Sequence, residues 1–146
     1  MTRKIVSICV AVALLFAVTT SINGATTGSF HIDPNNPNST SVSMSLSLGG
    51  TSATATTSMP YGFCTLSASV VAYYFLDEEL GSVPGNWGSS STTAIPVEWY
   101  SVSATAYTPP SQSGTVRAVG AISTHGASSP DGSMSNGGTL RAGNIP

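Results

Sequence analysis

Charged side chains are scarce in this sequence. Only 7% of its 146 residues are charged, with four basic residues against six acidic ones. So few lysines and arginines exclude the basic patch that binding to nucleic acid or anionic lipid requires. They also exclude a coiled coil or a charge-rich helical bundle. Acid–base catalysis needs positioned ionisable groups, so we expect a protein that is not an enzyme and carries no cofactor.

Cysteine and lysine are almost absent as well. The chain has two cysteines, Cys9 and Cys64, and Lys4 is its one lysine. Cys9 lies in an N-terminal apolar run, so removal of that run leaves no pair for an internal disulfide. Loss of Lys4 with it excludes an isopeptide cross-link too. Cys64 falls on the apolar side of an alternating segment, which predicts a buried and unreactive thiol.

The first 25 residues have the pattern of a secretory signal peptide. Arg3 and Lys4 precede an apolar run of about 14 residues, from Ile5 to Val18, and small polar residues follow. The run is shorter than the roughly 20 residues of a membrane-spanning helix. We therefore expect cleavage near Ala25, no stable membrane insertion afterwards and an extracellular location. The remaining chain would carry two basic and six acidic residues, a net charge of −4.

The rest of the chain alternates between hydroxyl-bearing and apolar residues. Serine and threonine make up about three in ten residues after position 25, more than in average domains. Segment 41–48 reads SVSMSLSL and segment 51–58 reads TSATATTS, with Gly49-Gly50 between them. A period of two residues is typical of a half-buried strand. The two-glycine link favours a tight hairpin.

Further alternating segments predict strands at 63–76, 97–108 and 115–124, with a shorter one at 29–32. The first is longer than most strands, so we expect a bend or bulge near Val70. Residues 77–96 have no useful period and hold several Gly and Pro, which predicts a long loop. The predicted core consists of Val42, Met44, Leu46, Leu48, Leu66, Val70, Val102, Val116 and Ile122.

These segments predict an all-β protein, an antiparallel β-sandwich or a curled barrel of about five to seven strands. The predicted domain covers residues 26–125 and follows the signal peptide at 1–25. Residues 126–146 are rich in Gly, Ser and Asn. That composition predicts a flexible tail with at most one short strand near Thr139.

Aromatic residues are the candidate ligand-binding groups. Trp99 and Tyr107 fall on the Ser/Thr side of their predicted strand. Tyr73 has outward parity in segment 63–76, and Trp87 lies in the predicted loop. Rings beside hydroxyls can stack on sugar faces or anchor a protein partner. The alternative is that the same rings fill a packing layer between two sheets.

The densest charge in the sequence is the run Asp77, Glu78 and Glu79. Carboxylates of this kind can bind Ca²⁺ or act in glycoside hydrolysis. Three adjacent carboxylates after an apolar strand are more often a solvated turn, so we predict no metal site. His31 and His125 show no metal-ligand spacing, and we expect both to be exposed at strand ends.

The sequence therefore predicts a secreted, non-catalytic β-sandwich that acts by surface contact. It would be envelope-associated, adhesin-like or carbohydrate-binding, with an extracellular glycan or protein surface as its partner. One alternative is a self-assembling structural protein, because the uncharged segment 69–76 has high β propensity. The other is a small acid–base hydrolase that uses Asp77, Glu78 or Glu98.

Overall fold

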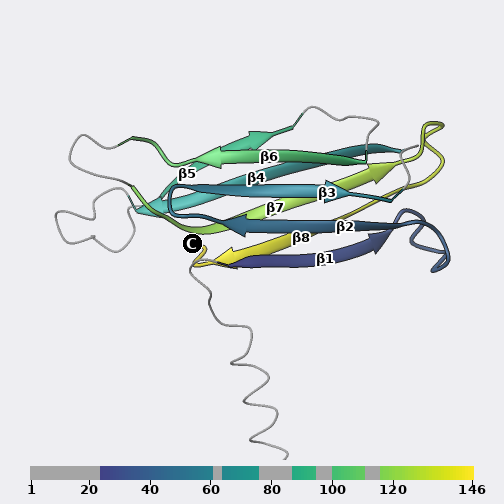
Figure 1. The fold of residues 1–146 in the computed structure, drawn as a ribbon, viewed down its shortest axis with the longest axis horizontal. Coiled ribbons are helices and arrows are strands. Elements are labelled where there is room, and N and C mark those ends of the chain that lie inside the picture. Colours follow the sequence, from purple (N-terminus) through teal and green to yellow (C-terminus); the bar gives the residue numbers. More distant parts are fainter. Residues whose placement is uncertain (1–23, 61–63, 76–86, 95–99, 111–115) are drawn as a thin grey trace, which may run out of the picture.

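Two four-stranded antiparallel sheets pack face to face in the computed structural model of the protein (Figure 1). The structure describes residues 24–60, 64–75, 87–94, 100–110 and 116–146, so most of the predicted signal peptide lies outside it. The strands are β1 (Ala25–His31), β2 (Ser41–Leu48), β3 (Ser52–Ser58), β4 (Thr65–Phe75), β5 (Trp87–Thr93), β6 (Ser101–Tyr107), β7 (Ala118–Ser128) and β8 (Ser135–Gly143). The sheet orders are β1-β2-β3-β6 and β5-β4-β7-β8. The predicted β-sandwich is confirmed, and it has eight described strands.

Alternation in the sequence becomes alternation of burial in β2 and β3. Leu46 and Leu48 of β2 point into the sandwich, and the serines between the apolar residues face outward. Ala55 of β3 is buried in the same way. The backbone N–H of Gly49 donates to the carbonyl of Ser52 at 2.8 Å where the chain reverses. The predicted hairpin is confirmed.

The core between the sheets combines a few large side chains with many alanines. Seven of the nine predicted core residues are buried, namely Val42, Met44, Leu46, Leu48, Leu66, Val70 and Val102. Alanines from four strands, β3, β4, β6 and β7, fill the positions between them: Ala53, Ala55, Ala68, Ala72, Ala104, Ala106, Ala118, Ala121 and Ala127. Close packing in protein interiors requires large residues to face small ones. The alanines therefore make room for the Leu and Val side chains opposite.

Side-chain hydrogen bonds join the two sheets along one edge, where β1 lies beside β8 (Figure 1). The Thr26 hydroxyl of β1 donates to the carbonyl of Arg141 in β8 at 3.3 Å. The Asn136 Nδ2 of β8 donates to the carbonyl of His31 in β1 at 2.7 Å. The first and last strands of the described chain thus hold each other in place.

Strand β5 forms where the sequence predicted a loop. It pairs with β4, from Ser69 opposite Thr93 to Phe75 opposite Trp87. β5 is an edge strand of Gly, Ser and Thr after its first residue, and positions 89 and 91–93 are exposed. Backbone pairing to one neighbour holds such a strand. Because it has no alternating apolar face, the periodicity that reveals strands in a sequence is missing.

A β-bulge interrupts the pairing of β4 with β7. The register shifts between Tyr73, which pairs with Gly120, and Tyr74, which pairs with Ala118. Val119 is the extra residue on β7. The irregularity predicted near Val70 in the long strand is not found there: β4 runs continuously from Thr65 to Phe75, and the inserted residue lies on its neighbour β7. An inserted residue reverses the facing of every side chain that follows it.

The bulge makes the predicted inward facing of Ile122 wrong. Ile122 turns outward and is half-buried, while Ser123 and His125 turn into the core. Val116, which precedes β7, is also half-buried and not part of the core. The predicted exposure of His125 is therefore wrong as well: its side chain is 2% exposed in the middle of a strand.

Residues 126–146, expected to be a tail, are largely part of the sandwich. β7 continues to Ser128, and the nine-residue strand β8 pairs with it along its length. The connecting turn is ordered by Asp131, whose carboxylate accepts from the Ser129 hydroxyl at 2.6 Å and the Ser133 hydroxyl at 2.8 Å. Gly132 completes the turn with a φ of 71°, in the left-handed region that glycine adopts without a steric cost.

Candidate functional site

The outer face of sheet β1-β2-β3-β6, here called the hydroxyl face, presents hydroxyl groups in three rows across the strands. The rows are Ser29–Ser43–Ser58–Ser101, Thr27–Ser45–Thr56–Ser103 and Ala25–Ser47–Thr54–Thr105. Ala25 is the one position in these rows without a hydroxyl. Strand geometry sets the repeats of this array, about 4.8 Å across the strands and about 6.7 Å along them.

The hydroxyl face carries no formal charge and is partly free to bind. Its four strands contain no Asp, Glu, Lys or Arg. On β3 and β6 the hydroxyls bond to one another, Thr54 to Thr105 at 2.9 Å and Thr56 to Ser103 at 2.8 Å. The outward hydroxyls of β1 and β2 in the three rows make no side-chain hydrogen bond within the described residues. Because a hydroxyl both donates and accepts, this half can bond to a ligand.

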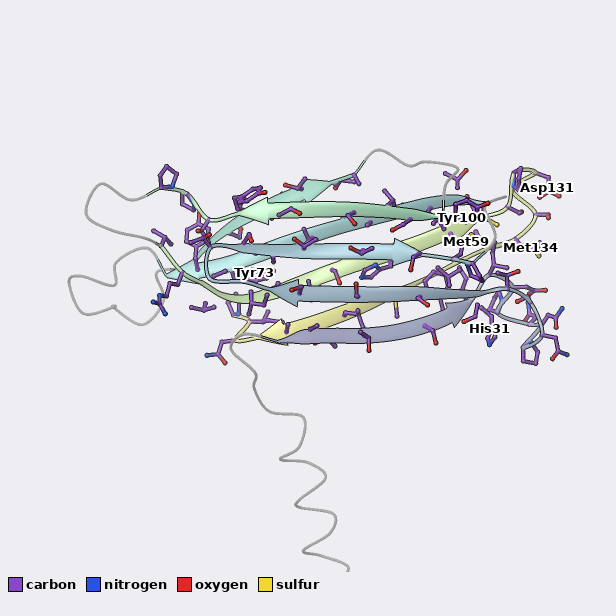
Figure 2. All side chains as sticks on the ribbon, in the orientation of Figure 1. His31, Met59, Tyr73, Tyr100, Asp131 and Met134 are labelled. Carbon is purple, nitrogen blue, oxygen red and sulfur yellow. The ribbon has the colours of Figure 1, made fainter. Side chains whose placement is uncertain are left out.

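The predicted aromatic residues do not form a single site. Tyr107 lies at the end of β6 on the hydroxyl face, opposite Ser52, and is 67% exposed. Tyr73 lies on the outer face of the other sheet and is half-buried (Figure 2). The two tyrosines therefore face opposite sides of the sandwich. Trp99 and the side chain of Trp87 lie outside the described residues.

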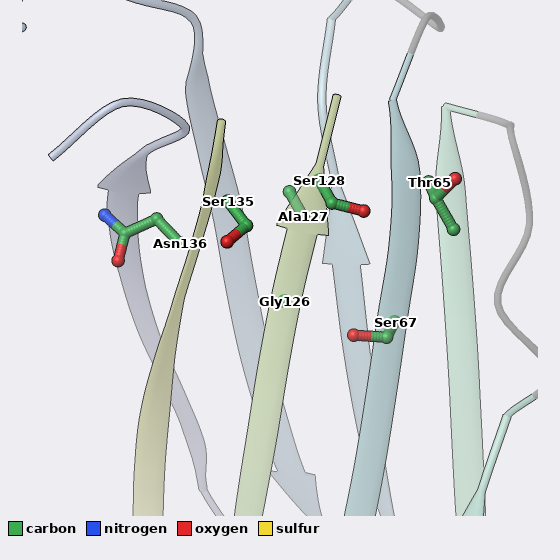
Figure 3. A pocket seen from close by; sticks show the side chains of 7 residues that line it. All are labelled: Thr65, Ser67, Gly126, Ala127, Ser128, Ser135 and Asn136. Carbon is green, nitrogen blue, oxygen red and sulfur yellow. The ribbon is translucent and has the colours of Figure 1, made fainter. Parts of the chain in front are cut away.

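The second sheet carries a shallow polar hollow on its outer face, here called the glycine hollow. Figure 3 shows its lining residues, which come from three adjacent strands: Thr65, Ser67, Gly126, Ala127, Ser128, Ser135 and Asn136. Its volume is about 330 Å³. Four of these residues bear hydroxyls, one bears an amide and none is charged. This site was not predicted from the sequence, because residues 135–143 were not predicted as a full strand.

A hydrogen-bonded chain crosses the core at His125. Its Nδ1 lies 2.9 Å from the Thr57 hydroxyl and its Nε2 lies 2.7 Å from the Ser123 hydroxyl. The Thr57 hydroxyl in turn donates to the carbonyl of Ser67 at 2.7 Å. Because a carbonyl only accepts, the single Thr57 proton is used there, and Thr57 must accept from the ring. The ring therefore carries its proton on Nδ1, and Nε2 accepts from Ser123.

This order of groups resembles a serine nucleophile beside a histidine base, but it is closed to substrate. Ser123 and Thr57 are fully buried, and His125 is nearly so. A threonine also stands where hydrolases place the carboxylate that stabilises a charged imidazole. Burial lowers the pKa of His125, so the ring is neutral near pH 7. We assign the hydrogen-bonded series of Thr57, His125 and Ser123 a structural role in the core.

The remaining candidates are not brought together by the described residues. Asp77, Glu78, Glu79 and Glu98 lie outside them. His31 is exposed at the end of β1, as predicted. Cys64 is buried, also as predicted, and burial raises the pKa of its thiol. Within the described ranges no three His, Cys, Asp or Glu residues gather as a metal site would require.

The sequence carries a signal for the hydroxyl face but none for the glycine hollow. Hydroxyl-bearing residues at alternate positions of three predicted strands already indicated the hydroxyl face, although not its register. The glycine hollow depends on Gly126 of one strand lying beside Gly137 of the next, and pairing of this kind is not readable from a single sequence.

No helix in the described part of the chain is long and apolar enough to cross a bilayer. No protein-family model, no curated protein and no solved structure matches this chain.

Proposed function

We propose that this protein is a secreted, non-catalytic module that adheres through its hydroxyl face to a neutral, hydroxyl-rich polymer such as an extracellular polysaccharide. The observation that carries the proposal is the set of three hydroxyl rows in register across four strands, uninterrupted by charge. A surface of average composition would place charged groups among them. An uncharged array of donors and acceptors complements a polymer of the same kind.

Tyr107 adds a stacking surface at one end of the hydroxyl face. Its ring is largely exposed beside the row that ends at Thr105. Aromatic faces pack against the apolar faces of sugar rings, and their edges stay in water. The hydroxyl face with Tyr107 thus provides both hydrogen bonding and stacking on one side of the molecule.

Sedimentation with insoluble polysaccharides tests the proposal. Purified protein is mixed with cellulose, chitin or an insoluble α-glucan, and the bound fraction is measured at low salt and at about 1 M salt. We expect binding to at least one polymer that high salt does not release, because no ion pair is involved. Ser45→Glu places a charge in the central row and should weaken binding by at least about tenfold.

The matched control is Thr124→Glu, which adds the same charge to an exposed position on the opposite sheet. It should bind like the unchanged protein. Tyr107→Ala should weaken binding without changing the unfolding midpoint, because the ring is exposed. Equal binding by the Ser45 and Thr124 variants, or no binding to any of the three polymers, would contradict the proposal.

No specific observation favours the two alternatives, a self-assembling structural protein or a small acid–base hydrolase. The segment that suggested self-assembly is largely β4, an interior strand whose backbone pairs on both sides with β5 and β7. The carboxylates of the hydrolase hypothesis lie outside the described residues.

A further inference from the structure

We propose that the glycine hollow binds a single ring of a neutral sugar, or a cyclic polyol of the same size. The hollow lies on the outer face of β4, β7 and β8, across the sandwich from the hydroxyl face (Figures 1 and 3). It is therefore a second site, and its occupation does not depend on adhesion through the other sheet.

The hollow exists because two side chains are missing from one row of the sheet. Ser67 pairs with Gly126, and Gly126 pairs with Gly137. The rows on either side carry three hydroxyls each, Thr65–Ser128–Ser135 and Ser69–Thr124–Thr139. Outward side chains stand roughly perpendicular to the sheet, so a row with glycine at two of three positions forms a depression between two raised rows.

The two glycines are held for different reasons. A Cβ on Gly137 would meet the backbone carbonyl of His125, so backbone packing requires glycine there. A Cβ on Gly126 would meet only the Ser67 hydroxyl, at 2.6 Å, with no backbone atom closer than 3.9 Å. The Ser67 side chain can rotate away. Space alone therefore does not require glycine at 126, and a side chain there would fill the hollow.

The lining groups select an uncharged ligand with several hydroxyls. The hydroxyls of Thr65, Ser67, Ser128 and Ser135 make no hydrogen bond to other described side chains or backbone groups. Each can both donate to and accept from a ligand hydroxyl. No lining residue carries a charge to pair with an ionic ligand, and no large apolar side chain is present to hold a lipid chain.

Asn136 fixes the strand that borders the hollow. It pairs with Ala127, which is buried between the sheets, so the Asn136 side chain lies on the inner side of β8 and only its backbone borders the hollow. Its Nδ2 donates to the carbonyl of His31 in β1 at 2.7 Å, and its Oδ1 accepts from the backbone N–H of Gly137 at 2.9 Å. These bonds hold the β8 backbone beside the hollow without a ligand.

The size of the hollow favours one ring over a longer chain. Small-molecule sites occupy about 300–1,000 Å³, and a volume of about 330 Å³ is near the lower limit. A shallow site of this size should bind weakly, with a dissociation constant on the order of 1 mM.

Titration of the ¹⁵N-labelled protein with methyl glucoside, methyl galactoside and methyl mannoside, each up to about 100 mM, tests the assignment by amide chemical shifts. We expect saturable shifts at the amides of Gly126, Ser128 and Asn136 with at least one sugar. Gly126→Val should fill the hollow and weaken the binding of that sugar at least about tenfold. Ser91→Val places the same side chain at an exposed position of β5 on the same outer face, outside the lining and the two raised rows, and should leave the affinity within about twofold.

The spectrum of each variant reports whether the fold is intact, and Ser67→Ala serves as a second, smaller change if Gly126→Val does not fold. Ser67→Ala should weaken binding severalfold without filling the site. The assignment is overturned if none of the three sugars shifts these amides, or if the Gly126 and Ser91 variants bind alike. Ser45→Glu should not affect the titration, so failure of the hydroxyl-face proposal and failure of this one are separable.

Discussion

His125 is the residue whose chemistry depends most on where the fold places it. When the His125 ring is neutral, each hydrogen-bonding group around it has a partner. The Ser123 hydroxyl donates to Nε2, Nδ1 donates to the Thr57 hydroxyl, and that hydroxyl donates to the carbonyl of Ser67. Protonation makes Nε2 a donor, so Ser123 must accept and its own proton loses its acceptor. A positive charge is also placed in the core without a described counter-charge, which is costly.

We therefore predict that the protein loses stability as the pH falls below about 6.5, the ordinary pKa of histidine in the unfolded chain. The lowered pKa of His125 in the folded protein means that the unfolded state takes up a proton first. The contribution of neutral His125 to the free energy of unfolding is complete above pH 6.5. It declines as the pH falls from there toward the pKa of His125 in the folded protein. Urea unfolding at pH values between about 7.5 and 5 measures the loss.

Two variants connect this pH dependence to His125. His125→Leu should be less stable throughout but should show a flatter profile, because the titrating group is gone. His31→Gln removes an exposed histidine and should retain the slope. A profile in the unchanged protein that is flat over this range would contradict the prediction. Asp131 does not interfere, because hydrogen bonds from Ser129 and then Ser133 lower its pKa to about 2.

At the scale of elements, β4 shows how one strand can be apolar on both sides and still fit a two-layer fold. Val70, Ala72 and Tyr74 are buried between the sheets, whereas Val71 and Tyr73 face outward and are half-buried. On the outward face Val71 lies opposite Ile122 of β7, which is also half-buried. Adjacent valines on this strand therefore have very different surroundings.

We predict that lysine is tolerated at position 71 and not at position 70. Val71→Lys should change the free energy of unfolding by less than about 1 kcal/mol, because the ammonium reaches water along the sheet surface. Val70→Lys would place the charge in the core and should cost more than about 4 kcal/mol, enough to unfold most of the protein. Chemical denaturation of both variants gives the comparison.

Val71→Lys should also reduce fibre formation by partly unfolded protein, because it adds a charge to an otherwise uncharged segment of high β propensity. A thioflavin assay near the unfolding midpoint measures this effect. Similar destabilisation by the two lysines would show that the outward face of β4 is covered by another layer.

At the scale of the whole molecule, stability rests on non-covalent packing. Residues 24–146 contain no lysine and one cysteine, and that cysteine is buried. Neither an isopeptide bond nor an internal disulfide can join the sheets. Packing of β2, β4 and β6 side chains against the alanines of the facing strands, and the β1–β8 contacts, hold the sandwich together.

We predict that the intact mass of the purified protein equals its sequence mass, with no loss of the ammonia or water that an isopeptide bond would release. Its unfolding midpoint should be the same with and without reductant, because the buried Cys64 is the one cysteine of residues 24–146. Mass spectrometry and denaturation check the two halves. A mass deficit, or a midpoint that reductant lowers in the unchanged protein but not in Cys64→Ala, would contradict them.

The sequence by itself determined the fold class, the β2–β3 hairpin and most of the core. These depend on local periodicity and on glycines at a turn, and both are written in consecutive residues. The buried faces of β2, β3 and β6 follow directly from their alternation. The hydroxyl face follows as the other side of the same pattern.

The tertiary structure alone decided the facing of β7, the existence of β5 and β8, and the two polar sites that depend on them. One extra residue at Val119 reverses the facing of the residues that follow, and no local signal marks it. β5 and β8 are edge strands held by backbone pairing, so their Gly- and Ser-rich sequences read as loop and tail. The glycine hollow and the His125 chain arise only when residues distant in sequence pair across strands and sheets, because contacts of that kind leave no periodicity in the chain.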